Sequence, residues 1–174
     1  MERSMKTSMS RSMSTSMKTL IAAGLMTVAG AATAAGVTSP LVGAWTLDVA
    51  TLPMPPQVRP QRVSLEFRDV APDRWATKVE IIDAAGQRLD SASTVVLDGS
   101  PGKATGSYFV DVVAARMPEP NVLVMQFIFE GIPRSTRVYS VSADGAVLTE
   151  TETYFLKDGT PKMRVAQFKR SAPK

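Results

Sequence analysis

Apolar and polar residues alternate with a period of two along much of this 174-residue chain. The clearest runs are residues 45–49, 63–68 and 75–81, where Trp, Leu, Val, Phe and Ile occupy every second position. Beyond residue 34, no stretch has the three-to-four-residue spacing of an amphipathic helix. Successive side chains of a strand point to opposite faces, so each run places one apolar face on a core and one polar face in water. The pattern predicts antiparallel β-sheet.

Short turn sequences separate the predicted strands. Asp83–Gly86, Ala143–Gly145 and Lys157–Gly159 each end in a glycine next to or near an aspartate, a combination that tolerates the positive φ of tight hairpins. They join neighbours in sequence, which predicts a meander. The strands are expected near residues 42–49, 62–69, 74–82, 87–97, 106–115, 121–130, 136–142, 146–156 and 162–169. We therefore expect an all-β fold of eight or nine antiparallel strands. It would be a closed barrel or a strongly curled sheet, since both hide strand edges.

Three segments depart from simple alternation. Residues 52–60 hold four prolines and are expected to be an extended crossover, neither strand nor helix. Residues 98–103 (DGSPGK) are expected to be a loop. Residues 121–130 (NVLVMQFIFE) are apolar on both faces. This strand either exposes a stripe to a partner protein or a second copy, or is covered on its outer face by the proline-rich crossover.

The amino-terminal residues 1–34 are predicted to be a secretory signal peptide. Lys18 precedes a short apolar run, Leu20–Val28, and Ala32-Thr33-Ala34 gives a small-x-small cleavage pattern. Methionine recurs every four residues from Met1 to Met17, which suggests that the true start is Met17. Cleavage after Ala34 would leave one domain, residues 35–174, in the periplasm or secreted. The apolar run is too short for a permanent anchor, so no membrane span is expected after cleavage.

The composition argues against several function classes. The chain has no cysteine and no histidine, which excludes a disulfide framework, a thiol nucleophile and a Ser-His-Asp triad, and removes the usual ligands of zinc. We expect no enzyme activity, no metal and no cofactor. Residues 35–174 carry a net charge of +1 because four of the 20 basic residues precede residue 35 with only one of the 16 acidic residues. The basic residues form no cluster, so a nucleic-acid partner is not expected.

The order of the motifs resembles a family of small exported bacterial lipocalin-like proteins whose function is uncharacterised. The opening Gly43-Ala44-Trp45 matches the G-x-W signature, and Asp-Gly hairpins follow along the chain. The other shared elements are Pro55-Pro56, Asp83–Gly86, Asp98-Gly99, Thr105-Gly106, Val141–Gly145 and Lys157–Pro161. The resemblance implies a calycin-type barrel in which the tryptophan closes one end beneath a late arginine, here Arg164 or Arg170. Leu97 departs from the family's usual tyrosine.

Two functions stay open at this point. The first is binding of a small apolar ligand inside the barrel, with lining residues expected to be Trp45, Leu65, Phe67, Trp75, Thr77, Val79, Ile81 and Thr151. Alternating threonines at 149, 151 and 153 favour a hollow interior over a filled one. The second is a protein–protein contact in the cell envelope, such as a protease inhibitor, made through residues 121–130. Glu150 and Glu152 share one face of a strand and are expected to be solvated, with Arg137 or residues 162–164 as cross-strand partners.

Overall fold

The computed structural model of the protein describes residues 38–171, where the chain forms ten strands and two short 3-10 helices. The predicted signal peptide and its cleavage site lie outside the described residues. The strands are β1 (Gly43–Leu47), β2 (Arg62–Ala71), β3 (Arg74–Ile82), β4 (Arg88–Val96), β5 (Asp98–Gly106), β6 (Val112–Glu119), β7 (Val122–Phe129), β8 (Ile132–Val141), β9 (Val147–Phe155) and β10 (Pro161–Arg170). The helices η1 (Val49–Thr51) and η2 (Pro56–Val58) lie between β1 and β2.

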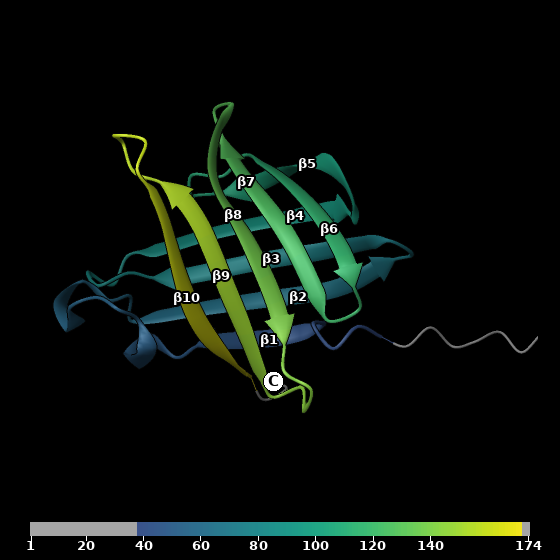
Figure 1. The fold of residues 1–174 in the computed structure, drawn as a ribbon, viewed down its shortest axis with the longest axis horizontal. Coiled ribbons are helices and arrows are strands. Elements are labelled where there is room, and N and C mark those ends of the chain that lie inside the picture. The colour runs from purple at the N-terminus through teal and green to yellow at the C-terminus, as the bar shows by residue number, and fades with distance from the viewer. Residues whose placement is uncertain (1–37, 172–174) are drawn as a thin grey trace, which may run out of the picture. The chain divides into compact units, whose positions relative to one another are not determined.

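Each strand pairs antiparallel with the next along the chain, and β1 also pairs with β10, so the sheet closes on itself (Figure 1). The predicted all-β antiparallel meander closing into a barrel is confirmed. The three predicted hairpins are also confirmed: β3 pairs with β4, β8 with β9, and β9 with β10. Closure gives every one of these strands a neighbour on both sides, although β5 pairs with β4 along only three residues.

The segment expected to be a loop at residues 98–103 instead forms most of β5. This strand was not predicted and brings the total to ten. The pairing register shifts between Asp98 and Pro101, and Gly99 takes a φ of 90° there. Pro101 is tolerated because β5 pairs with β4 only at residues 104–106, so the missing N–H removes no bond on that side. The expected strand 106–115 is divided at a loop of residues 107–111, and β6 begins at Val112.

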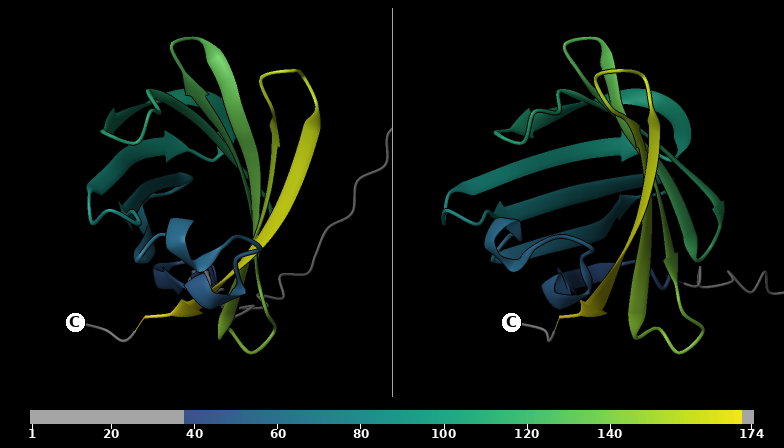
Figure 2. Two further views of the ribbon diagram at one scale, coloured as in Figure 1. Left: turned by 90° about the vertical axis from the view of Figure 1, so that its left-hand side faces the viewer. Right: turned by 60° about the vertical axis from the view of Figure 1, so that its left-hand side comes forward.

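The proline-rich crossover contains one turn of 3-10 helix, which was not expected. Pro56 opens η2, where its fixed φ and missing N–H are both acceptable. Leu52 is buried and Met54 packs against the same interior core. The crossover therefore packs on the barrel interior from one end of the barrel, and this argues against it as a cover for the outer face of β7 (Figure 2).

The interior core is continuous from end to end of the barrel. Its largest fully buried side chains are Trp45, Tyr139, Phe67, Phe168, Leu41, Leu123 and Leu148. Phe67 packs against Trp75 and against the edge of Tyr139, with ring centroids 6.1 and 5.4 Å apart. These inward faces are the ones that the alternation predicted, and their aromatic rings fill most of the lumen.

One end of the barrel is closed by Trp45. Its indole N–H donates to the Leu41 carbonyl at 2.9 Å, and the Arg170 guanidinium lies 4.1 Å from the ring centroid. Arg170 also donates to the carbonyls of Pro40, Val42 and Gly145, which ties the amino-terminal segment to the β8–β9 turn. Gly43 has a φ of 133°, and a Cβ there would lie 2.6 Å from the guanidinium. Of the two arginines expected above Trp45, Arg170 is the one that stacks.

Candidate functional site at the barrel mouth

The predicted ligand residues separate into three groups. Leu65, Phe67, Thr77 and Val79 line one small interior void. Ile81 shares the inward face of β3, while Trp45 and Trp75 are buried in the core without bordering that void. The prediction for Thr151 is wrong, because Glu150 and Glu152 on either side are buried and their alternation turns Thr151 to the outer wall.

The interior void measures about 20 Å³. A single water needs at least about 10–15 Å³, so the void has room for one water and no ligand. The threonines of β9 do not widen it because residues 149, 151 and 153 all lie on the outer face. The Thr77 hydroxyl is already paired with Ser93 Oγ at 2.7 Å. In this conformation the barrel is filled by its own side chains.

A cup of about 600 Å³, much larger than the interior void, lies at the end of the barrel opposite Trp45. We call this end of the barrel the mouth. Because consecutive strands are antiparallel, this end gathers the 107–111 loop, the β7–β8 turn and the β9–β10 turn. Five of the residues that line the cup are aromatic. The lining residues are Tyr108, Phe109, Val110, Phe127, Ile132, Pro133, Arg134, Ser135, Arg137, Glu152, Tyr154, Phe155, Leu156, Lys157 and Arg164.

A buried ionic network forms the floor of the cup. Arg137 Nη2 lies 2.9 Å from Glu152 Oε1, and Nη1 lies 3.5 Å from Glu150 Oε2. The same guanidinium donates to the Tyr108 hydroxyl at 3.1 Å and lies 4.8 Å from the centroid of the Phe127 ring. Arg137, Tyr108 and Phe127 border both the cup and the small interior void. They are the partition between the two.

The network fixes the charge of Arg137. Burial by itself disfavours a charged guanidinium, but Tyr139, Glu150, Tyr108 and Glu152 surround it, and the net result is a pKa above the ordinary arginine value. Burial, reinforced by the Glu150 carboxylate, raises the pKa of Tyr139 well above its usual value near 10. Arg137 therefore stays cationic and Tyr139 stays protonated across the physiological range.

Arg164 extends the network towards solvent. Its Nε forms an ion pair with Glu152 Oε2, and its guanidinium lies 5.8 Å from the Tyr154 ring centroid. The Arg164 side chain is 36% exposed, against 10% for Arg137, so it can also contact a molecule in the cup. The lining has four basic side chains and one acidic one, and with Glu150 of the floor counted the excess is two positive charges.

The expectation that Glu150 and Glu152 are solvated is wrong, although Arg137 and Arg164 are their partners as predicted. Both glutamates are 5% exposed. Charged residues on alternate strand positions ordinarily indicate a wet face, which is why the sequence did not place them inside. One signal was present: Leu148 shares the face of Glu150, and Tyr139 and Val141 share the face of Arg137.

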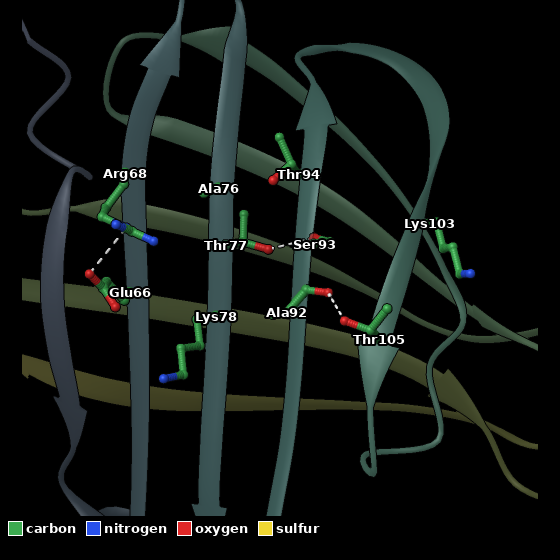
Figure 3. A pocket seen from close by; sticks show the side chains of 10 residues that line it. All are labelled: Glu66, Arg68, Ala76, Thr77, Lys78, Ala92, Ser93, Thr94, Lys103 and Thr105. Atoms are coloured by element: carbon green, nitrogen blue, oxygen red, sulfur yellow. Dashed lines mark hydrogen bonds and ion pairs between the residues drawn. The ribbon is translucent and has the colours of Figure 1, made fainter.

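Other hollows lie on the outer wall. One of about 320 Å³ crosses β2–β5 and is lined by Glu66, Arg68, Lys78, Lys103 and small residues, namely alanines, threonines and a serine (Figure 3). Two others have volumes of about 640 and 650 Å³, comparable with the cup, but neither contains an aromatic side chain. The cup is thus distinguished by chemistry rather than size, since binding sites combine apolar walls with a few convergent polar groups.

Residues 38–171 contain neither a cluster of metal-ligating side chains nor a helix that could span a membrane. In that range no three acidic side chains come together as a metal site would require. Neither of the helices described there has the length and apolar character to cross a membrane.

No family model matches this sequence, and no curated protein matches it either.

Proposed function

We propose that this chain is an exported lipocalin-like binding protein that holds a small amphiphile with an anionic end in the cup at the barrel mouth. The observation that carries the proposal is the cup itself, where five aromatic side chains and, with Glu150 in the floor counted, an excess of two positive charges surround one hollow of about 600 Å³. Cavities of roughly 300–1,000 Å³ are typical of small-molecule sites. The signal-peptide pattern supports export, and Trp45 beneath Arg170 supports the lipocalin-like assignment.

The apolar part of the ligand would contact the aromatic wall. Phe109, Phe127 and Phe155 offer rings from three different segments, and burial of ligand surface against them contributes about 25 cal/mol per Å² before the costs of association. The proposed site is therefore the cup at the mouth and not the barrel interior, where the sequence predicted it. Apolar lining remains the source of affinity.

The anionic end would be received by Arg164 and Arg134. Arg137 already contacts two carboxylates and the Tyr108 hydroxyl, so it has little left to offer. Arg164 pairs with Glu152 through Nε and is 36% exposed, and Arg134 is exposed; both line the cup. Guanidinium groups bind carboxylate or phosphate in a bidentate manner, which gives orientation as well as affinity.

Calorimetric titration with dodecanoate and with dodecanol tests this proposal. Dodecanoate should bind saturably and more tightly than dodecanol, and Arg164→Gln should remove most of that difference. Arg68→Gln is a matched control, since Arg68 is 64% exposed on the outer wall of β2. Trp45 and Trp75 do not line the cup, so tryptophan fluorescence should stay unchanged on binding. A large fluorescence change would place the ligand in the interior, and the absence of saturable binding would refute the proposal.

A second candidate is a partner-protein contact through residues 121–130. The outer face of β7 continues into an uncharged wall, since Val124, Val138, Thr151 and Val165 lie side by side across four strands. Val138 and Val165 are 36% and 51% exposed. Size-exclusion chromatography with light scattering, on the chain alone and after mixing with envelope proteins, compares the parent with Val165→Glu. Loss of a complex in the variant would support this contact.

A further inference from the structure

Four large apolar side chains stand exposed at the tips of the three segments that surround the mouth. Phe109 is 58% exposed, Ile132 63%, Phe155 73% and Leu156 42%. They lie on the 107–111 loop, the β7–β8 turn and the β9–β10 turn. Scattered apolar residues on a surface need no explanation, but four at one end of a small barrel form a group that does. We call them the mouth tips.

The mouth tips are held together by defined contacts. The Phe109 ring meets Phe129 edge to face at 5.8 Å, and the Asp111 carboxylate accepts the Glu130 backbone N–H at 2.9 Å. These contacts fix the 107–111 loop to the β7–β8 turn. The neighbouring β9 strand pairs with β8, so the β7–β8 and β9–β10 hairpins project side by side from the same end (Figure 2).

Part of the backbone at the β9–β10 tip is hydrogen-bonded within the turn. The Leu156 N–H donates to the Thr160 carbonyl, and the Gly159 N–H donates to the Leu156 carbonyl. The Asp158 carboxylate accepts the Thr160 N–H. Each of these hydrogen bonds satisfies a donor within the turn, which lowers the cost of placing the turn in the interfacial region of a bilayer.

Basic side chains lie directly behind the mouth tips. Arg134, Lys157 and Lys162 are exposed next to them, against the exposed acids Glu130 and Asp158. Two of these basic residues, Arg134 and Lys157, also line the cup, where they join Arg137, Arg164 and Glu152. Apolar tips backed by basic side chains match the order of layers that an anionic bilayer presents, with acyl chains beneath negative headgroups.

We propose that the mouth docks on the surface of a bilayer containing anionic lipid, with the tips in the interfacial layer and the cup open towards the lipids. The protein lies on the membrane and does not span it through these tips. This contact goes beyond the proposed function because it does not require the cup to hold an amphiphile. A bilayer accepts separate protruding side chains without a matching pocket, whereas a protein partner needs a complementary surface. The tips protrude rather than form a flat patch, which favours the bilayer.

A single labelled cysteine tests the contact in the full chain. The sequence contains no cysteine, so Phe155→Cys and Val70→Cys each accept one environment-sensitive NBD fluorophore. Val70 is 50% exposed near the β2–β3 turn, at the opposite end of the barrel. With vesicles of phosphatidylcholine containing one quarter phosphatidylglycerol, the label at 155 should shift to the blue and gain intensity, and the label at 70 should not. The local readout distinguishes tip insertion from binding through residues 17–34.

Two further variants test the apolar and the electrostatic contributions to docking separately. They are measured with the same vesicles and with an NBD label on Leu156→Cys. Ile132→Ser should weaken vesicle affinity about tenfold, while Met163→Ser, which is 68% exposed on the side wall, should leave it unchanged. Lys157→Gln should weaken it about fivefold on the anionic vesicles and have little effect on pure phosphatidylcholine. All substituted positions are exposed, so folding should be preserved, and circular dichroism checks this.

Equal responses from the labels at 155 and 70, or no response from either on anionic vesicles, would overturn the proposal. A response at 155 that appears only with an added protein would assign the tips to a protein partner instead. Dodecanoate titration of the parent chain without vesicles separates the two ideas. Saturable dodecanoate binding without a vesicle response at 155 refutes only the docking, and a vesicle response at 155 without saturable dodecanoate binding refutes only the ligand in the cup.

Discussion

Replacing Arg137 with Met leaves two glutamates inside the barrel without their central cation. The parent guanidinium lies 2.9 Å from Glu152 and 3.5 Å from Glu150, and it also donates to Tyr108. Removing one partner of a buried ion pair costs about 3–5 kcal/mol, since the remaining charge stays buried. Glu152 keeps its ion pair with Arg164, so most of the penalty falls on Glu150. We therefore expect the lower end of that range, about 3 kcal/mol.

Urea unfolding followed by tryptophan fluorescence measures the loss. With a slope of about 2 kcal/mol per molar urea, typical of a small domain, the midpoint should fall by about 1.5 M. Arg62→Met is the matched control, because Arg62 pairs with Glu80 on the surface and its side chain is 55% exposed. Exposed pairs contribute about 0–1 kcal/mol, so this control should move the midpoint by less than 0.5 M.

The double variant Arg137→Met with Glu150→Gln isolates the reason for the loss. If an unpaired buried charge is the cause, neutralising Glu150 should recover at least about 1 kcal/mol of the lost stability, a coupling typical of contacting residues. Equal midpoints for the Arg137 and Arg62 variants would refute the reasoning. So would additive losses in the double variant, because they would mean that the charges do not interact.

Three further outcomes follow from the fold and the sequence. Trp45→Ala should cost about 3–5 kcal/mol in urea unfolding, because a fully buried ring is lost beneath Arg170. Tyr139 keeps its proton in the folded state while an unfolded tyrosine loses it above about pH 10, so stability should fall by about 1.4 kcal/mol per pH unit there, and Tyr139→Phe should remove that slope. Amino-terminal sequencing of the exported protein should give Ala35 or a residue within a few positions, whereas an intact Met1 or Met17 would contradict the predicted cleavage.

Local patterns in the sequence were enough for most of the fold. Alternation placed Leu65 and Phe67 on an inward face, and the Asp-Gly turns paired β8 with β9 and β9 with β10. These signals work because side-chain direction in a strand and φ in a tight turn depend on neighbouring residues only. Strand β5 was not predicted because its conformation depends on a partner strand and not on its own neighbouring residues. Its Gly and Pro residues have no strand preference of their own, and pairing with β6 on one side holds them in the sheet.

The candidate site was decided by tertiary structure. The alternation that defines one inward face cannot tell whether the lumen is hollow, because that depends on how Phe67, Trp75 and Tyr139 meet across the barrel. Likewise, Glu150 and Glu152 resemble a solvated pair in sequence, and they are buried because Arg137 lies opposite them at the same depth. The cup joins side chains from residues 108 to 164 that no local spacing connects. The sequence alone determined nearly all of the strands and their antiparallel order, with β5 as the exception. Closure of the barrel determined which charges went inside and left the cup at the mouth.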